Sequence, residues 1–502
     1  MDFVIDNGTL VKCALDGETS VVIPENVQSI GKKVFMDCSS IKSVTLPSGL
    51  KVIGKRAFCG CSSLAEINIP DTVQVIEERA FSECSAITSV TLPQGLSELS
   101  FFAFEKCSSL KKVVFPDSLT AFDDFVFVNC ASLETVHLPN SLKKIPCNTF
   151  ENCTSLQQIV IPDDVTIIRA NAFKNCRSLK NVVIPKNVVR IGDAAFLNCS
   201  SLDMIVFPPN LQEIGAYAFL NCSSLTDVSL PQGITQLKSS TFYDCESLIN
   251  IELPDTITVL ASQSLGNCKS IKHIKLPSAL TEIRHNVFNG CSALEEVEFP
   301  ESVTRVGDEA FMHCYSLKSV HFPDAVEEIG EFAFCCCWKL ERVDLPCELK
   351  TIGESAFHDC DLLNYVSYLG YELDVSACQD NRLLVECIAE LIKSKDYFSD
   401  INLSIKYTVA MQMFLRYAQP EAELFIKNNA VSVIDYFIDA DDYISVKKLI
   451  DSGVADRAED VIDILNHAIE HTQNGGNVQI QVYITNYRLT NFPDANVSPD
   501  IL

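Results

Sequence analysis

One cysteine recurs every 23 residues along most of the chain. Fifteen cysteines from Cys38 to Cys360 keep this step, and fifteen prolines from Pro24 to Pro346 keep the same step. A fixed period in this range is typical of a solenoid, in which each unit buries its apolar face only by stacking on its neighbours. The spacing therefore predicts a repeat protein built from stacked coils of 23 residues.

Each repeat contains a segment with the alternation of a short strand. Six residues after the cysteine every repeat has Val or Ile, from Val44 to Val366, and two residues later the position is again apolar, as at Leu46. β-Branched residues that alternate with variable ones are typical of a strand with one buried face. The proline that follows lacks an N–H and ends the strand. Strands repeated at this interval predict a parallel sheet.

The rest of each repeat returns the chain to the next strand. Phenylalanine occupies one position in fourteen of fifteen repeats, with Leu265 as the exception, which predicts a stack of rings through the interior. Glycine recurs at one corner, which suggests a turn with positive φ. The corner glycines are Gly31, Gly54, Gly192, Gly215, Gly307, Gly330 and Gly353.

The cysteines in phase with the repeat are interpreted as a ladder of buried free thiols. Stacking in register places equivalent Cβ atoms about 4.8 Å apart, whereas a disulfide needs about 3.8 Å. Unpaired thiols in this number favour a reducing compartment. The run Cys335-Cys336-Cys337 has a metal or redox site as its alternative reading, but no paired C-x-x-C with downstream His or Cys accompanies it.

Composition and motifs exclude several classes of function. The formal net charge is −27, which argues against a nucleic-acid groove and against docking on an anionic membrane. No apolar stretch approaches the roughly 18–20 residues of a membrane span, and the N-terminus has no apolar core typical of a secretory signal. No catalytic motif is found. We therefore expect a cytoplasmic protein that is not an enzyme, with no catalytic, metal or cofactor site.

The repeat resembles the BspA-like class of leucine-rich repeats. The pattern P-x-x-[VL]-x-x-I-G-x-x-A-F-x-x-C-x-S-L-x-x-V-x-L carries the resemblance, as in IGKRAFCGCSSLAEINIP (53–70), and covers roughly residues 1–368. The opening FVIDNGTLVKC is similar to the N-terminal hairpin of such proteins, with Asn7-Gly8 at the tight turn. The resemblance implies a bacterial, arc-shaped solenoid that binds proteins, often as a surface adhesin. An exported or cell-surface protein is thus the alternative.

A helical region follows the repeats. Residues 370–502 hold 21 acidic and 10 basic residues, and apolar residues recur there at helical spacing, for example Leu384, Ile388 and Leu391. The segment SVKKLIDSGVA (445–455) faintly resembles an ankyrin helix and turn. The region is interpreted either as a cap over the last coil or as a second partner or dimer site.

These observations predict a β-rich solenoid of about fifteen coils followed by an all-α region. The expected domains are a hairpin and capping coil at 1–36, the solenoid at 37–368 and the helical region at 369–502. We expect the exposed strand face to bind a protein partner, because five consecutive coils are mostly apolar at its outward position. These candidate residues are Val114, His137, Val160, Val183 and Val206. The alternative is that valine simply suits a strand.

Overall fold

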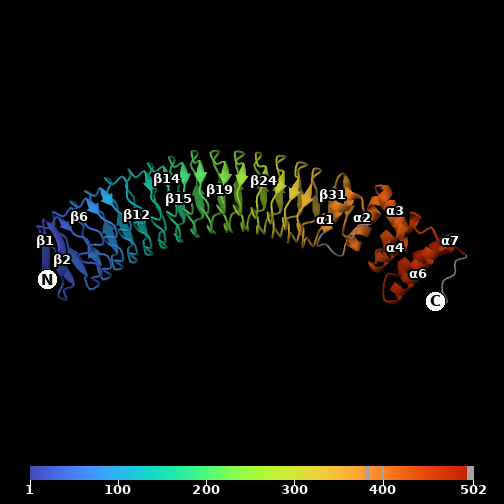
Figure 1. Cartoon of the computed structure of the whole chain (residues 1–502), viewed down its shortest axis with the longest axis horizontal. Coiled ribbons are helices and arrows are strands. Elements are labelled where there is room, and N and C mark those ends of the chain that lie inside the picture. The colour runs from blue at the N-terminus through green and yellow to red at the C-terminus, as the bar shows by residue number, and fades with distance from the viewer. Residues whose placement is uncertain (377, 379–383, 398–400, 494–502) are drawn as a thin grey trace. The chain divides into compact units, whose positions relative to one another are not determined.

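A computed structural model describes residues 1–376, 378, 384–397 and 401–493 of the chain. It contains a β-solenoid of about sixteen turns with parallel sheets, followed by helices, which confirms the expected fold class (Figure 1). The chain divides into two compact units, Met1–Tyr315 and Ser316–Leu502, and the boundary between them lies within the repeats. The domain boundaries expected after residues 36 and 368 remain predictions.

The first unit begins with a hairpin. Strand β1 (Asp2–Asp6) pairs antiparallel with β2 (Thr9–Ala14), and Asn7 and Gly8 both have positive φ, at 47° and 76°. These angles suit the tight turn expected from the Asn-Gly pair. Strand β2 then pairs in parallel with the first coil, so the hairpin covers the end of one sheet.

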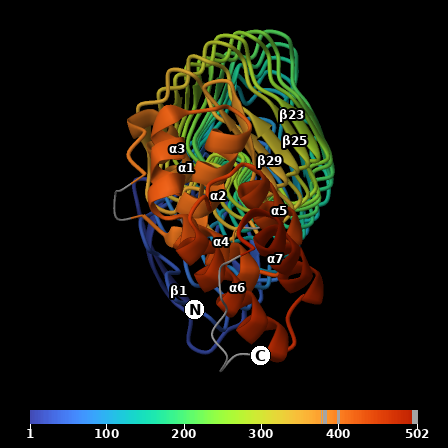
Figure 2. The ribbon, with the colours of Figure 1, turned by 90° about the vertical axis from the view of Figure 1, so that its right-hand side faces the viewer.

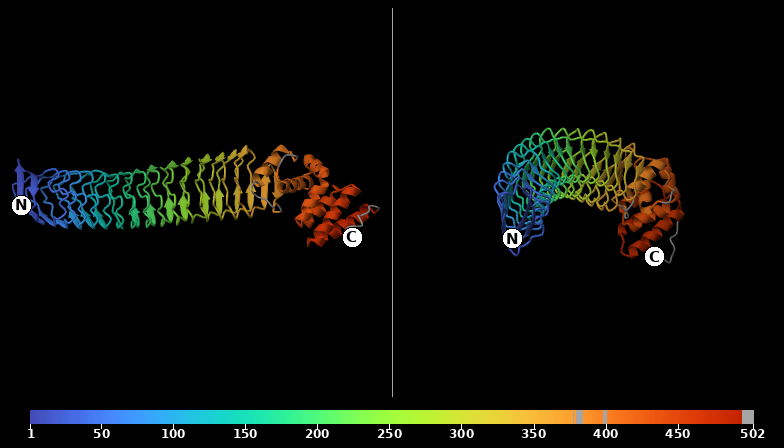
Figure 3. Two further views of the ribbon diagram at one scale, coloured as in Figure 1. Left: turned by 60° about the horizontal axis from the view of Figure 1, so that its bottom comes forward. Right: turned by 60° about the vertical axis from the view of Figure 1, so that its left-hand side comes forward.

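Coils of the first unit carry two separate rows of short parallel strands (Figure 3). The row predicted from the Val/Ile pattern comprises β3 (Ser20–Val22), β5 (Ser43–Thr45), β7 (Glu66–Ile67), β9 (Ser89–Thr91), β11 (Lys112–Val114), β12 (Thr135–His137), β15 (Asn181–Val183), β17 (Met204–Val206), β19 (Asp227–Ser229), β21 (Asn250–Glu252), β23 (His273–Lys275) and β25 (Glu296–Glu298).

A second row forms where the sequence pattern showed only a returning segment. It comprises β4 (Ser29–Ile30), β6 (Val52–Ile53), β8 (Val75–Ile76), β10 (Glu98–Leu99), β13 (Lys144–Ile145), β14 (Ile167–Ile168), β16 (Arg190–Ile191), β18 (Glu213–Ile214), β20 (Gln236–Leu237), β22 (Val259–Leu260), β24 (Glu282–Ile283) and β26 (Arg305–Val306). These two-residue strands keep the same register from coil to coil, as in Val52 opposite Val75.

The phenylalanine stack forms as predicted. In the first unit the rings lie parallel at centroid distances such as 5.1 Å between Phe173 and Phe196, and each is fully buried. Leu265 interrupts the stack between Phe242 and Phe288 and is itself buried. Each ring therefore fills the space between successive coils.

The expectation that the corner glycines have positive φ is wrong. Gly54 and Gly215 have ordinary φ, but a Cβ added to Gly54 would lie 2.5 Å from the Ile30 carbonyl oxygen. At Gly215 it would lie 2.4 Å from the Asp193 backbone nitrogen. At these two positions glycine thus accommodates the close approach of the preceding coil and not a turn with positive φ.

The second unit contains the last repeats and the helices. Its strands are β27 (Ser319–His321), β28 (Glu328–Ile329), β29 (Arg342–Asp344), β30 (Thr351–Ile352), β31 (Tyr365–Tyr368) and β32 (Tyr371–Asp374). Strand β32 turns back and pairs antiparallel with β31, so the repeating parallel pattern ends there.

Seven helices lie in the described part of this unit. They are α1 (Leu384–Ser394), α2 (Leu403–Leu415), α3 (Pro420–Asn428), α4 (Ala430–Asp439), α5 (Tyr443–Asp451), α6 (Ala458–Gln473) and α7 (Val478–Asn491). Helix α5 begins where the Asp442 carboxylate accepts the Ser445 N–H at 3.0 Å and ends before Gly453 at φ 78°. Helices α4, α6 and α7 group together (Figure 2). None of the helices in the described ranges is long and apolar enough to cross a membrane.

Candidate functional site

The candidate residues lie on the outward side of the predicted strand row. Val160, Val183 and Val206 are 82%, 68% and 53% exposed, His137 is exposed and Val114 is half-buried. Their neighbours one position earlier face inward, as Val182 and Ile205 do at 2% and 5% exposure. The two-residue alternation therefore places the candidate side chains in solvent.

The parallel register brings some of these residues side by side. Val114 lies opposite His137 on β11 and β12, and Val183 lies opposite Val206 on β15 and β17. Val160 belongs to no named strand, because its coil pairs with the next through a single bridge, Gln158 to Asn181. A cavity of about 470 Å³ lies at this place and is lined by both Val160 and Val183.

A second, larger cavity follows on the same face. It measures about 760 Å³, and its lining includes Met204, Val206, Asp227 and Glu252. Met204 is 53% exposed but was not among the candidates. It occupies the other outward position of its strand, two residues before Val206, and counting both outward positions would have found it.

Beyond Val206 the outward residues become polar. Asn250 Nδ2 donates to the Asp227 carboxylate at 2.7 Å, and this hydrogen bond holds the pKa of Asp227 below its usual value. Ser229 Oγ donates to the Glu252 carboxylate, also at 2.7 Å. His273 Nδ1 lies 3.4 Å from a Glu296 oxygen. The face thus has an apolar part and a polar part rich in carboxylates.

The cysteine ladder has a structural role. The 23 cysteines, all of them among the described residues, form no disulfides. In the interior, repeat thiols donate to the backbone carbonyl of the ring-stack residue one coil earlier, for example Cys176 Sγ to Phe150 O at 3.2 Å and Cys291 Sγ to Leu265 O at 3.3 Å. Burial raises the pKa of the Cys61 thiol to about 12, so it stays protonated at neutral pH. This bonding confirms the expected ladder and leaves no nucleophile there.

The run of three cysteines contains one close pair of thiols. Cys335 Sγ lies 3.4 Å from Cys336 Sγ, and Cys336 Sγ lies 3.8 Å from an Asp359 oxygen. Burial raises the pKa of the Cys336 thiol, which lowers its reactivity. Across the described ranges, no three His, Cys, Asp or Glu side chains are arranged to hold a metal ion.

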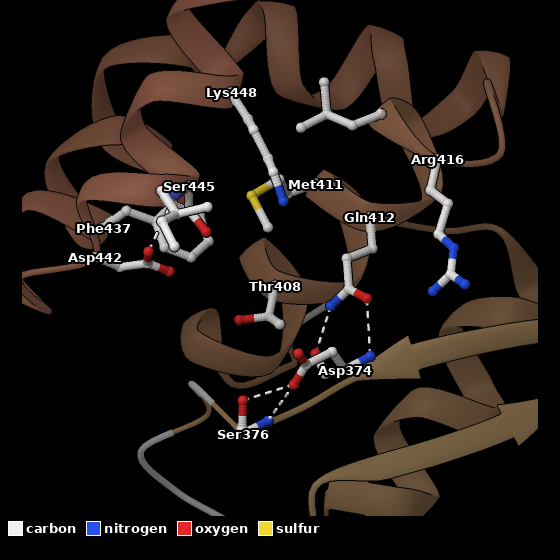
Figure 4. Close-up of a pocket in the computed structure, with 12 residues that line it drawn as sticks. Asp374, Ser376, Thr408, Met411, Gln412, Arg416, Phe437, Asp442, Ser445 and Lys448 are labelled. Carbon is white, nitrogen blue, oxygen red and sulfur yellow. Dashed lines mark hydrogen bonds between the residues drawn. The ribbon is translucent and has the colours of Figure 1, made fainter.

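A pocket in the helical region with a mixed apolar and polar lining was not predicted from the sequence. It measures about 630 Å³ and is lined from β32, α2, α4 and α5 by residues that include Asp374, Thr408, Gln412 and Lys448 (Figure 4). Gln412 holds the end of β32, because its amide oxygen accepts the Asp374 N–H at 2.9 Å and its amide nitrogen donates to the Asp374 carbonyl. These residues are far apart in sequence, so no local motif marks the pocket.

Several polar groups of this pocket are engaged in the fold. The Asp442 carboxylate caps α5, and Arg416 donates to the Glu372 carbonyl at 2.9 Å. The Ser376 hydroxyl donates to the Asp374 carboxylate at 2.6 Å, and the Ser376 N–H donates to the same oxygen at 3.1 Å, so this serine closes the turn after β32. The arrangement stabilises the contact between β32 and the helices, and the strand face remains the stronger candidate site.

Comparison with known proteins agrees with the geometry. A family model described as the BspA type leucine rich repeat region matches residues 5–134, 121–249 and 235–364. A crystal structure of a leucine-rich repeat protein from Bacteroides ovatus is 28% identical, covering 73% of this chain and 97% of that chain, with a TM-score of 0.57.

A leucine rich cell surface protein from Faecalibacterium prausnitzii is 24% identical, covering 74% of this chain and 93% of that chain, with a TM-score of 0.41. No curated protein sequence matches this chain significantly.

Proposed function

Because this chain belongs to the BspA-type leucine-rich repeat family, whose members are generally interaction or surface proteins, we propose that it is a non-catalytic module that binds a protein partner through its strand face. One observation carries the proposal. Val160, Val183 and Val206 expose more than half of their surface on three consecutive coils, where water-facing strand positions are ordinarily polar. Contiguous exposed apolar side chains mark protein contact sites.

The cavities on this face support the same proposal. Val160 and Val183 line one, and Met204 and Val206 line the next. Apolar side chains of a partner that enter such hollows gain contact area on several sides. Buried apolar anchors of this kind contribute most of the binding energy in protein interfaces.

Replacing Val160, Val183 and Val206 with Thr tests the proposal. Threonine keeps the β-branched shape that suits a strand, so the fold is expected to persist, while its hydroxyl stays hydrated in the free protein. We expect the Kd for the partner to rise at least about tenfold, or about 1.4 kcal/mol. The partner is first captured by a photo-crosslinking residue at position 183 and then titrated in purified form.

The matched control is Val4→Thr with Val11→Thr. These valines are 51% and 45% exposed but belong to the N-terminal hairpin. Their replacement is expected to leave the Kd unchanged within about twofold. If both variants raise the Kd equally, or if neither raises it, the strand face is not the binding site.

The proposed location is the cytoplasm, and display at the cell surface is the rival. The proposal rests on the 23 cysteines of the chain, because an oxidising compartment favours disulfides between accessible thiols such as Cys347, which is exposed. Cell fractionation followed by surface biotinylation separates the two locations. A labelled, externally accessible protein would establish the surface role.

A further inference from the structure

The strand face changes in character within one cavity. On β17 the outward residues Met204 and Val206 are apolar and both 53% exposed. On the next strands of the same sheet, β19 and β21, the outward positions include Asp227 and Glu252. Residues of both kinds line the cavity of about 760 Å³. A ligand that fills this cavity therefore meets an apolar wall and an acidic wall.

Both carboxylates on the acidic wall lack a basic partner among the described residues. Asp227 and Glu252 each accept a hydrogen bond from a neutral group, the Asn250 amide and the Ser229 hydroxyl, at 2.7 Å. These donors orient the carboxylates without neutralising them. Some other carboxylates that are hydrogen-bonded between coils pair with a basic group, for example Glu213 with Arg190 at 3.0 Å. Lys275 follows Glu252 at the same outward position one coil later, but no ion pair joins them within 4 Å. Two oriented carboxylates outside any ion pair of the described residues thus lie beside an apolar surface.

This inference rests on the proposed strand-face function. We propose that the partner binds through an extended segment that contains an apolar residue and a lysine or arginine about three residues before or after it. The apolar side chain contacts Met204 and Val206, and the basic group pairs with Asp227 and Glu252. Charge complementarity selects the basic residue, and arginine additionally matches a carboxylate with two parallel hydrogen bonds.

The spacing follows from the geometry of the coils. Neighbouring parallel strands lie about 4.8 Å apart, and Val206 and Glu252 belong to coils two steps apart, so the two contacts are separated by roughly 10 Å. An extended chain that crosses the strands advances about 3.3 Å per residue. Three residues therefore cover the interval.

A phage-displayed library of random ten-residue peptides, selected on the full chain, tests the proposal. We expect enrichment of peptides with Lys or Arg three residues from an apolar residue. Synthetic peptides from the selection are then titrated against the wild type and against Asp227→Asn with Glu252→Gln. Loss of two exposed ion pairs is expected to weaken binding about fivefold and to reduce its dependence on salt.

The matched control is Asp117→Asn with Glu25→Gln. These carboxylates accept hydrogen bonds from Asn140 and Ser48, as Asp227 and Glu252 do from their neighbours, but lie outside the strand row. This variant removes the same charge and is expected to bind as the wild type does. Equal weakening by the control would show that overall charge, not this cavity, attracts the peptides, and would overturn the proposal.

The other outcomes separate this proposal from the broader function. In one outcome, the selected peptides lack basic residues and still lose binding when the three valines are replaced. That result would overturn the basic-segment proposal and leave strand-face binding intact. Peptides whose binding withstands both the valine and the carboxylate replacements would overturn both. Circular dichroism of each variant confirms that the solenoid is folded.

Discussion

The phenylalanine stack gives the sharpest test of the packing. Phe173 is fully buried, and its ring lies 5.6 Å from that of Phe150 and 5.1 Å from that of Phe196. Truncation to alanine removes a buried ring and leaves a cavity, which costs about 3–5 kcal/mol. Each stacked pair contributes about 0.5–1.5 kcal/mol beyond burial. We expect Phe173→Ala to fall at the upper end of the range because it breaks two pairs.

The interruption at Leu265 supplies internal controls. Phe242 stacks on Phe219 at 5.4 Å and meets Leu265 on its other side, so Phe242→Ala breaks only one ring pair. It is expected to cost about 0.5–1.5 kcal/mol less than Phe173→Ala. Phe173→Leu copies the natural exception and is expected to cost about 1–3 kcal/mol, because it breaks both ring pairs but leaves a smaller cavity than alanine does.

Urea denaturation followed by circular dichroism measures these differences. The curves are fitted with nearest-neighbour coupling, because long repeat arrays need not unfold as one unit. Hydrogen exchange reports the local effect on the mutated coil. A cost below about 1 kcal/mol for Phe173→Ala, or a Phe242→Ala cost as large as that of Phe173→Ala, would refute the stacked-ring account.

Three further predictions concern thiols, pH and glycine. Under native conditions at pH 8, alkylation is expected to label the exposed Cys347 within minutes and to leave the buried Cys176 unlabelled. In the unfolded protein all 23 thiols are expected to react. Mass spectrometry of the peptides measures the labelling at each cysteine. Burial raises the pKa of Cys61 to about 12, above the roughly 8.5 of an unfolded thiol. The stability that the protonated thiol provides is therefore complete below about pH 8.5 and is lost as the pH rises toward 12. A urea midpoint that falls at alkaline pH would show this loss. Gly54→Ala is expected to cost about 1–3 kcal/mol because the new Cβ meets the Ile30 carbonyl, whereas Gly49→Ala, with no atom within 4 Å of its added Cβ, is expected to be nearly neutral in thermal unfolding.

Features that repeat along the chain were predictable from the sequence. The strand row, the ring stack and the thiol ladder each depend on one residue type at one position, and a position repeated fifteen times reveals its role. Asn7-Gly8 was equally informative, because the turn it forms is local.

Features that depend on contacts between segments were not predictable. The role of Gly54 depends on the Ile30 carbonyl of the preceding coil, which no local pattern reveals. The second strand row has only two residues per strand, too short for alternation to appear. The pocket beside Gln412 combines segments from Asp374 to Lys448, and its residues become neighbours only after the helices pack.

Hydrogen exchange of the whole chain with and without its captured partner tests the central claim most directly. Binding through the strand face predicts slower exchange in peptides that cover residues 112–252, with no change in peptides that cover the helices between residues 384 and 493. Protection confined to the helices, with the strands from β11 to β21 unaffected, would contradict the account.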